Sequence, residues 1–530
     1  MASPDYIIVG AGTAGCVVAN QLSASGKERV LLLEAGGSDQ SFWIKVPIGY
    51  GRTYNDPKFN WMYETEPDPA LGGVRNFWPR GKVLGGSGSI NALVYVRGQP
   101  RDFDDWRDLG NPGWSWNDVR PIYEAIESRT GGPLSVTDVS AFAHPLCRSY
   151  IDSCAALGYP FTADFNGEQR EGVGLYQITT RNGLRESTAT AFLRPALKRS
   201  NLQLELHAQV QRVNFAGRRA IGVSYAQDGQ TVTVSANKAV ILSGGSINSP
   251  QLLQLSGVGP GALLQRHGIT PVLDLPAVGQ NMQDHLAVSY FYRSRVKTLN
   301  NELYPLAGKL KAGLQYLLTR GGRLSMSVNQ GGGFIRSDSK LSAPDLQLYF
   351  NPASYTQTRE RTRRMLNPDP FPAFLLSFNA CRPTSRGHIA IKSASRAEAP
   401  SIVPNYLSTE QDLHDVQVGA RFLRRLAATM PLAGLIESEM LPGAALTTDA
   451  QLLQDFRQRA GTVFHPVSTC MMGPNAATAV VDARLRVHGM DGLRVIDASI
   501  FPTVTSGNTN APTVMVAAKG AAMAMEDAGA

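Results

Sequence analysis

The stretch DYIIVGAGTAGCVVANQLSASGKERVLLLEAGG, residues 5–37, carries the strongest structural signal in this chain. It opens with an apolar run of strand type, residues 6–9, and a segment with helical periodicity follows. Between them, three glycines occur in the spacing G-x-G-x-x-G: Gly10, Gly12 and Gly15. A second apolar strand, residues 30–33, ends at Glu34. This order of features predicts a β-α-β unit that binds a dinucleotide: a strand, a glycine turn, a helix, a second strand and an acid.

Each part of this unit has a physical task in binding. The first glycine permits the tight turn, the second lets the backbone approach a pyrophosphate, and the third lets the helix pack on the strand. The helix N-terminus presents free N–H groups and a positive dipole end to the phosphates. Glu34 can hold both ribose hydroxyls, and an acid there disfavours the 2′-phosphate of NADP. NAD and FAD both remain open, and the predicted contacts are Gly10, Gly12, Thr13, Ala14, Gly15, Glu34 and Ala35.

The composition is that of a globular enzyme. The chain has 530 residues, of which 43% are hydrophobic and 18% are charged, and its length suggests about three domain-sized units. Its five cysteines are scattered, and neither they nor the eight histidines show metal-ligand spacing. An odd cysteine count favours a reducing compartment. We therefore expect no metal site and a cytoplasmic location.

The charge pattern and the apolar runs limit the expected partners. The net charge is +8, but no dense basic run interleaved with aromatic residues indicates nucleic-acid binding. The one basic cluster, RERTRRM at 359–365, is expected to be a solvated loop, with a patch for a membrane surface or an acidic ligand as the alternative. The sequence shows no signal-peptide pattern and no uncharged apolar run of 18 residues. Peripheral contact at the inner face of a membrane is thus the only membrane association that we consider.

Two further glycine-rich stretches carry a family resemblance. PRGKVLGGSGSINALVYVRG covers residues 79–98, and SGGSINSPQLLQLSGVG covers residues 243–259. Both resemble signature segments of the glucose–methanol–choline (GMC) oxidoreductases, FAD-dependent enzymes that act on alcohols, and the resemblance extends to GNTNAPTVM at 507–515. It implies an α/β, Rossmann-like FAD-binding domain and a second, α+β substrate domain built on an antiparallel sheet. Of NAD and FAD, the resemblance selects FAD.

The resemblance also implies which residues contact the flavin. A loop as poor in bulk as residues 85–89 lets backbone amides lie against a flat ring and a diphosphate. Some family members carry a histidine that bonds covalently to FAD where this chain has Asn91, so we expect non-covalent FAD. Val210 matches the family position that lies against the adenine. Asp497 and Ala498 match family positions near the ribityl chain and the pyrophosphate. The remaining expected contacts are Arg80, Val83, Gly85, Gly86, Ser89, Ala92, Leu93, Val94, Gly244, Asn508 and Thr509.

A histidine near the C-terminus is the expected catalytic base. In TVFHPVSTC, residues 462–470, Pro466 disfavours a helical conformation at His465 and so predicts that this histidine lies at the end of an element. An imidazole can take the hydroxyl proton of an alcohol while a hydride leaves for flavin N5. Asn508 matches the second active-site residue of the family and can donate to a developing alkoxide, with Asn510 as a close competitor. The family usually has glycine where this chain has Ser468.

The chain divides discontinuously in this interpretation. The FAD-binding part takes residues 1–155, 200–295 and 460–530, and the substrate part takes residues 156–199 and 296–459. LQLYFNP and GHIAIKSA have strand character suited to the substrate sheet, and residues 410–430 have helical spacing. By resemblance, Gln330 occupies the position at which choline-oxidising members place an acid. Its amide is uncharged and lacks the attraction for the positive charge of choline, which disfavours choline as the substrate. Phe464 beside the base suits an apolar ligand.

The expected activity is oxidation of a primary alcohol to its aldehyde, with electrons passed to a quinone-like acceptor. An oxidase of the same family that uses O₂ is the first alternative. A lyase similar to the FAD-containing hydroxynitrile lyases is the alternative from another class. A photodecarboxylase is disfavoured, because relatives with that activity lack the histidine, and a flavin-binding protein without catalysis is least favoured.

Overall fold

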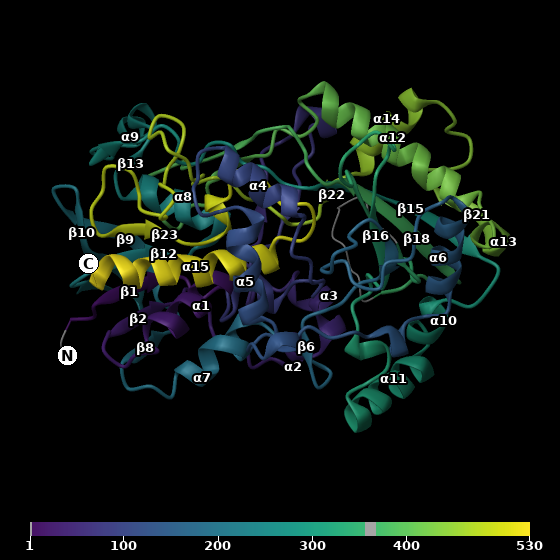
Figure 1. Cartoon of the computed structure of the whole chain (residues 1–530), viewed down its shortest axis with the longest axis horizontal. Helices are drawn as coiled ribbons and strands as arrows, with labels where there is room; N and C mark the ends of the chain where they lie inside the picture. Colours follow the sequence, from purple (N-terminus) through teal and green to yellow (C-terminus); the bar gives the residue numbers. More distant parts are fainter. Residues whose placement is uncertain (1–2, 356–366, 530) are drawn as a thin grey trace.

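The fold is that of a computed structural model, which describes residues 3–355 and 367–529. The basic cluster at 359–365 lies outside these ranges. Two halves lie side by side (Figure 1): one contains the parallel sheet and both chain ends, and the other contains a large antiparallel sheet. All five cysteines are buried and free. No helix within the described ranges is long and apolar enough to cross a membrane.

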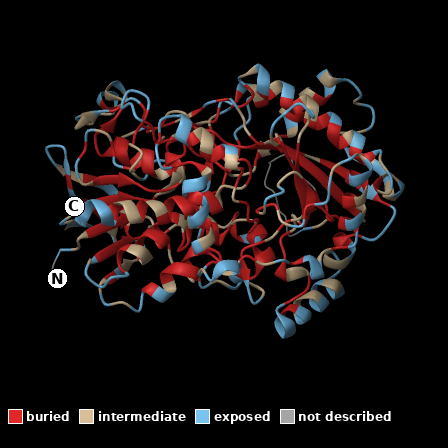
Figure 2. Cartoon of the chain, viewed as in Figure 1, coloured by how far each residue is buried: buried red, intermediate tan, exposed pale blue. Residues whose placement is uncertain are grey.

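The parallel sheet organises the first half. Its five strands have the order β23-β12-β1-β2-β8, with bounds β1 Tyr6–Val9, β2 Val30–Leu33, β8 Leu202–Glu205, β12 Ala239–Leu242 and β23 Leu493–Val495. Every neighbouring pair is parallel. The runs YIIV and VLLL are fully buried, as a parallel sheet covered on both faces requires (Figure 2). The strand order reverses beside β1, which is where open α/β sheets bind their ligands.

Helices and a small antiparallel sheet complete this half. Helix α1 (Thr13–Leu22) packs against α15 (Asn510–Gly529), and α5 (Trp116–Ile126) also contacts α15. Helix α8 (Gly245–Leu255) follows β12, and α4 (Pro100–Asp108) packs on α5. The small sheet has the order β11-β10-β9, with bounds β9 Gln209–Ala216, β10 Arg219–Gln227 and β11 Gln230–Ser235.

The second half is built on an antiparallel sheet of seven strands. Their order is β21-β15-β18-β17-β16-β5, and β22 pairs with β15. The bounds are β5 Gly172–Leu175, β15 Leu286–Ser294, β16 Gly331–Ile335, β17 Leu346–Asn351, β18 Ala373–Ala380, β21 Ile436–Leu441 and β22 Gly461–Thr462. The helices that pack on it are α6 (Leu146–Ala156), α12 (Glu410–Ala427) and α14 (Asp449–Arg459). The expected fold class, an α/β flavin half with an α+β substrate half on an antiparallel sheet, is confirmed.

Two strands pair differently from what the sequence led us to expect. Strand β15 lies within the segment 200–295 that was assigned to the FAD-binding part, yet it pairs with β18 and β21 of the substrate sheet. By strand pairing, residues 286–294 therefore belong to the antiparallel sheet. The strand in GHIAIKSA, β19 (His388–Ala390), pairs only with β20 (Ser401–Val403) in a separate ribbon. In both cases a distant pairing partner, invisible in the local pattern, decides where the strand belongs.

Helix α11 (Leu306–Thr319) projects at the lower right edge of Figure 1. It follows the short helix α10 (Leu299–Leu303) and contacts the 3₁₀ turn at 323–325. The chain then continues through Asn329, which lines the cavity described next.

Candidate active site

A cavity of about 330 Å³ lies between the two sheets. Its floor is formed by residues at the carboxyl ends of β1, β2 and β12, and its opposite wall by residues on β15, β17 and β18. The fold therefore brings the dinucleotide segment of the first half against the antiparallel sheet of the second. A cavity at this edge is where an α/β sheet is expected to hold a cofactor.

Most of the expected site residues line this cavity. They are Gly10, Gly12, Thr13, Ala14, Glu34, Ala35, Arg80, Gly86, Asn91, Ala92, Leu93, Val94, Val210, Gly244, Phe464, His465, Asp497, Ala498, Asn508 and Thr509. The lining within the described ranges does not include Gly15, Val83, Gly85, Ser89 or Gln330. The side chain of Gln330 is buried elsewhere, where its Oε1 accepts from the backbone N–H of His144 at 2.8 Å. Gln330 is thus held in a structural contact, and its expected place against the substrate is not what the geometry supports.

The three motif glycines meet different surroundings. Gly10 has a φ of 101°, and a Cβ there would lie 2.6 Å from the carbonyl oxygen of Ser243. A Cβ at Gly15 would lie 1.8 Å from the carbonyl oxygen of Gly10, so this glycine lets α1 pack on the turn. The nearest atom to a Cβ at Gly12 is 3.8 Å away, the Cα of Gly86. Protein packing therefore leaves room at Gly12, on the cavity side, which fits the close approach of a diphosphate.

Glu34 lies at the end of β2, as its spacing predicts. Its carboxylate accepts the backbone N–H of Ala11 at 2.9 Å and that of Gly36 at 2.8 Å. Burial raises the pKa of this carboxyl to about 7, and the two N–H bonds oppose that rise. A buried carboxylate on the cavity wall favours partners that donate hydrogen bonds, such as ribose hydroxyls.

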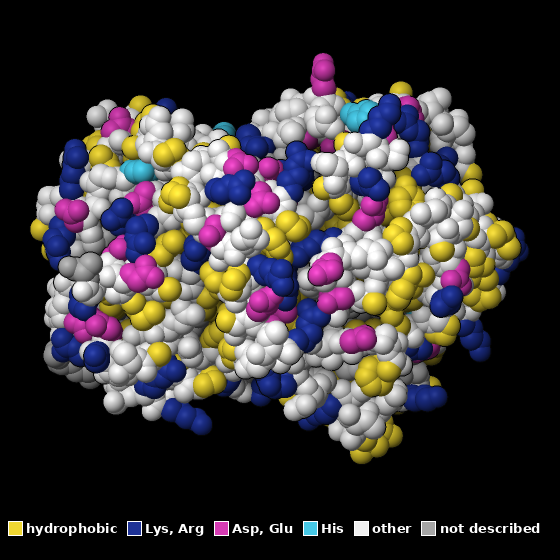
Figure 3. Space-filling view, viewed as in Figure 1, with side chains coloured by type: hydrophobic (Ala, Val, Ile, Leu, Met, Phe, Trp, Pro, Cys, Tyr) yellow, Lys and Arg dark blue, Asp and Glu magenta, His cyan; other side chains and the backbone are white. Residues whose placement is uncertain are grey.

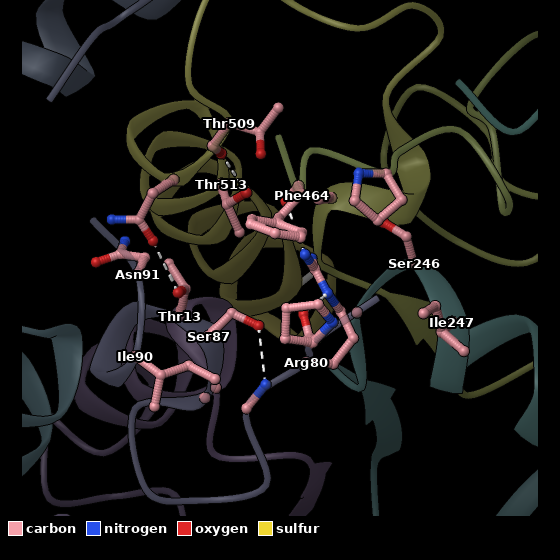
Figure 4. A pocket seen from close by; sticks show the side chains of 18 of the residues that line it. Thr13, Arg80, Ser87, Ile90, Asn91, Ser246, Ile247, Phe464, Thr509 and Thr513 are labelled. Atoms are coloured by element: carbon pink, nitrogen blue, oxygen red, sulfur yellow. Dashed lines mark hydrogen bonds between the residues drawn. The ribbon is translucent and has the colours of Figure 1, made fainter. Parts of the chain in front are cut away.

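Three helices begin at the cavity. The first turns of α1, α8 and α15 all contribute lining residues, and Thr13 Oγ1 donates to Asn510 Oδ1 at 2.9 Å, which ties two of these N-termini together (Figure 4). Helix N-termini carry free N–H groups and a partial positive charge. Their convergence suits an anionic diphosphate and a flavin ring that gains negative charge. Asn510, the competitor of Asn508, is thus engaged in this helix-to-helix contact.

The glycine-rich loop lies directly against α1. A Cβ at Gly86, whose φ is 56°, would lie 2.7 Å from the Cα of Gly12. The loop is fixed by a hydrogen bond from the Gly81 N–H to Ser87 Oγ at 3.1 Å (Figure 4). Asn91 Oδ1 accepts from the buried guanidinium of Arg185 at 2.8 Å. Both contacts fix the backbone that borders the cavity.

His465 forms a buried pair with His285. Their Nδ1 atoms lie 3.0 Å apart, and His285 Nε2 lies 2.9 Å from the carbonyl oxygen of Cys381. A carbonyl only accepts, so His285 carries its proton on Nε2 and, when neutral, must accept at Nδ1. His465 therefore donates from Nδ1, which leaves its Nε2 unprotonated, with the lone pair on the cavity side. Burial lowers the pKa of His285 to about 4, in agreement with a neutral ring.

Asn508 faces that lone pair. Its Nδ2 lies 3.1 Å from His465 Nε2, and its Oδ1 accepts from Gln347 Nε2 at 3.3 Å. Gln347 thereby fixes the orientation of the Asn508 amide, with the N–H₂ group toward the histidine. Burial, then the neighbouring His285, then the charge of Arg80 hold the pKa of His465 well below 6.5. His465 is thus a neutral base whose unprotonated nitrogen, Nε2, faces the amide donor of Asn508.

The backbone around His465 is held in a strained conformation. Phe464 and Ser468 have φ values of 71° and 74°, which are unfavourable for residues other than glycine. The His465 N–H donates to Asp284 Oδ1 at 2.7 Å, and Arg80 Nη2 donates to the Phe464 carbonyl at 2.8 Å (Figure 4). Such strain persists only where the surroundings over-determine it. The unusual serine at position 468 thus occupies a position that suits glycine, and these bonds keep the histidine in place.

Sequence reasoning missed two residues that support the base. His285, at the end of the segment VGQNMQDH (278–285), was grouped with the histidines that lack ligand spacing. Asp284, beside it, accepts from Tyr406 and Thr462 as well as from the His465 backbone. Since these partners lie more than 100 residues away, no local spacing could reveal them.

The chain belongs to the GMC oxidoreductase family: the N-terminal family domain matches residues 4–287, and the C-terminal one matches residues 383–517. It is 40% identical to an alcohol dehydrogenase [acceptor] of Pseudomonas putida, over 97% of this chain and 94% of that protein. It is 41% identical to the mitochondrial choline dehydrogenase of Homo sapiens, over 97% of this chain and 89% of that protein. The crystal structure of a pyridoxine 4-oxidase from Mesorbium loti superposes with a TM-score of 0.88 at 29% identity, over 98% of both chains.

Family membership makes FAD the cofactor, which confirms the choice between NAD and FAD. The residues present fit this group: room at Gly12, a buried acid at the end of β2, and three helix N-termini at one cavity. FAD supplies a two-electron acceptor when bound.

Proposed function

We propose that this protein oxidises a neutral primary alcohol to the aldehyde and passes the electrons to a quinone-like acceptor. The observation that carries the proposal is the unprotonated Nε2 of His465, a neutral buried base that faces the Asn508 amide in the cavity. The name of the Pseudomonas putida relative, an alcohol dehydrogenase [acceptor], supports the reaction class and transfer of the electrons to an acceptor.

The chain's own groups provide the proton chemistry. An alcohol hydroxyl at the cavity end of His465 gives its proton to Nε2, while the Asn508 N–H₂ donates to the oxygen that gains negative charge. His285 remains the acceptor for the Nδ1 proton and keeps the ring in this tautomer. Arg80 and Asp284 hold the backbone of 464–465, so the base does not have to be positioned during the reaction.

The charges around the cavity favour a neutral substrate over choline. Within the described ranges the acidic lining residues are Glu34 and Asp497, which lie at the ends of β2 and β23 in the dinucleotide half. Two cationic side chains, Arg80 and Arg396, line the cavity as well, and Arg396 stacks over Trp61 at 5.2 Å. A trimethylammonium group would meet like charge without a carboxylate to offset it. The aromatic and aliphatic wall of Tyr54, Tyr355 and Leu375 suits an alkyl or aryl alcohol.

The test is anaerobic mixing of the purified yellow protein with a panel of primary alcohols and choline. We expect neutral alcohols to bleach the flavin absorption at least about tenfold faster than choline does, and we expect a quinone to restore the colour faster than air. Rapid recovery in air would instead assign an oxidase. Failure of every alcohol to bleach the flavin would contradict the proposal and favour the lyase. Because Asn91 replaces the histidine of covalent relatives, acid precipitation of the same sample should leave FAD in the supernatant.

A second prediction concerns His285 as the residue that positions the base. In His285→Ala we expect kcat/KM for alcohols to fall at least about tenfold, because His465 loses the acceptor that fixes its tautomer. We expect this loss in kcat, with KM for alcohols within about twofold of the wild type, because His285 lies outside the cavity lining within the described residues. Steady-state rates over a range of alcohol concentrations separate kcat from KM.

His488→Ala is the matched control. His488 Nε2 also lies 2.9 Å from a backbone carbonyl, that of Gly473, but His488 does not line the cavity. The control should keep the wild-type kcat and KM. An unchanged kcat in His285→Ala, with normal flavin content, would show that His285 has only a structural role.

A further inference from the structure

Helix α11 exposes a continuous row of leucines. Of its 14 residues only Tyr316 is buried. Five leucines are more than half exposed, with exposed fractions between 58% and 75%: Leu306, Leu310, Leu314, Leu317 and Leu318. Single exposed leucines are common on soluble proteins, but five on one helix form an apolar patch of the kind that marks an interaction site.

The leucines point away from the rest of the protein. At about 100° per residue, the five side chains fall within an arc of about 120°. Tyr316 falls on the opposite side, where its hydroxyl donates to the Gly183 carbonyl at 2.8 Å. The helix projects from the body of the molecule (Figure 1), and hydrophobic side chains gather with basic ones on this projection (Figure 3). The body of the protein therefore leaves this face uncovered.

Lysines flank the leucine row, and the helix carries no acid. Lys309 and Lys311 fall on either side of the apolar arc, and Arg320 follows at the C-cap. The nearest acid in sequence, Glu302, is paired with Arg323 at 2.8 Å. An apolar face bordered by lysines, on a helix that cannot span a bilayer, is the pattern of helices that lie in the plane of a membrane interface. There the long lysine side chains reach anionic headgroups while the leucines enter the acyl boundary.

We propose that α11 docks this protein on a membrane surface that contains anionic lipid. A second copy of the chain is the competing occupant, but two α11 faces packed together would bring four lysines close without an acid on either helix to pair with them. An anionic surface satisfies both the leucines and the lysines. This inference is independent of the proposed reaction, because it concerns a surface that lies outside the cavity.

The experiment is flotation of the full-length holoenzyme with vesicles of phosphatidylcholine, or of phosphatidylcholine with about 30% phosphatidylglycerol. We expect at least about tenfold more protein on the anionic vesicles, and a decrease of this binding at high salt. The double substitution Leu310→Ser, Leu314→Ser should reduce the amount of vesicle-bound protein at least about tenfold, while the flavin content stays at the wild-type level. The double substitution Lys309→Glu, Lys311→Glu should abolish the preference for anionic vesicles.

Leu109→Ser serves as the matched control, since Leu109 is 52% exposed but stands at the end of α4. It should bind as the wild type does. Equal binding to both vesicle types, no binding to either, or undiminished binding of the leucine variant would each overturn the proposal. Light scattering identifies the competing occupant: a dimer that becomes monomeric in the leucine variant, without vesicle binding, would assign the face to a second copy.

Discussion

Replacing His465 by alanine is expected to slow alcohol-dependent flavin reduction by about 10²–10⁴-fold, the usual contribution of a general base. The physical reason is specific to this site. His465 Nε2 is the neutral acceptor that faces the Asn508 amide, and its partner His285 already uses both ring nitrogens, one toward Cys381 and one toward His465. His285 therefore cannot replace the lost base from its present position. Anaerobic stopped-flow mixing with the best alcohol of the panel measures the rate.

Flavin content and chemical rescue separate a lost base from a damaged fold. The alanine variant should keep its FAD, because the dinucleotide end of the cavity is built by other segments. Added imidazole should restore part of the rate, since the substitution leaves a space of that shape between His285 and Asn508. His267→Ala, at the C-cap of α9 (Gly261–Arg266) and outside the cavity lining, should behave as the wild type does. A full reduction rate in His465→Ala would refute the assignment of the base.

The sequence predicted those parts of the fold that are encoded locally. Strands β1 and β2 were expected at 6–9 and 30–33, and they occur with these bounds. A short apolar run bounded by turn residues is typical of a buried strand. The helix expected within 410–430 is α12, Glu410–Ala427, whose first turn is capped by the Thr409 side chain. Its amphipathic spacing, acidic start and basic end agree with one another.

The active site depends on pairings that no local pattern contains. His285 and His465 are 180 residues apart, and they meet because β22, just before His465, pairs with β15, just after His285. A search for ligand spacing along the chain tests only neighbours, so it overlooked this pair. Gln330 is the opposite case: its position was inferred from resemblance, and in the structure its side chain accepts from the His144 backbone, while the cavity lining within the described residues does not include it.

At Ser468 the sequence predicts an unusual position but not the contacts that stabilise it. The family usually has glycine at this position, and the backbone has a φ of 74° there, a conformation that favours glycine. The sequence could not show how the strain is tolerated. That depends on the bonds that Asp284 and Arg80, both remote in the chain, make to the backbone of 464–465.

Replacing Glu34 by alanine is expected to yield protein that is largely free of FAD. The substitution removes the acceptor expected for the ribose hydroxyls, and it leaves the N–H groups of Ala11 and Gly36 without their buried partner. Each unpaired group costs about 1–3 kcal/mol. The ratio of flavin to protein absorbance measures the occupancy, and circular dichroism checks the fold. Glu205→Ala is the matched control, because Glu205 ends the adjacent strand β8 but does not line the cavity.

The pH dependence of FAD binding separates the ribose role from a role in holding the turn. Burial places the pKa of Glu34 in the cofactor-free protein at about 7, and hydroxyls that donate to its carboxylate must lower that pKa in the complex. Binding then releases a proton, so the affinity for FAD should fall as the pH drops below about 7 and level off above it. Glu34→Gln cannot titrate and should lose this dependence. If the wild type and Glu34→Gln show the same pH dependence in a titration of apoprotein with FAD, Glu34 acts on the turn alone.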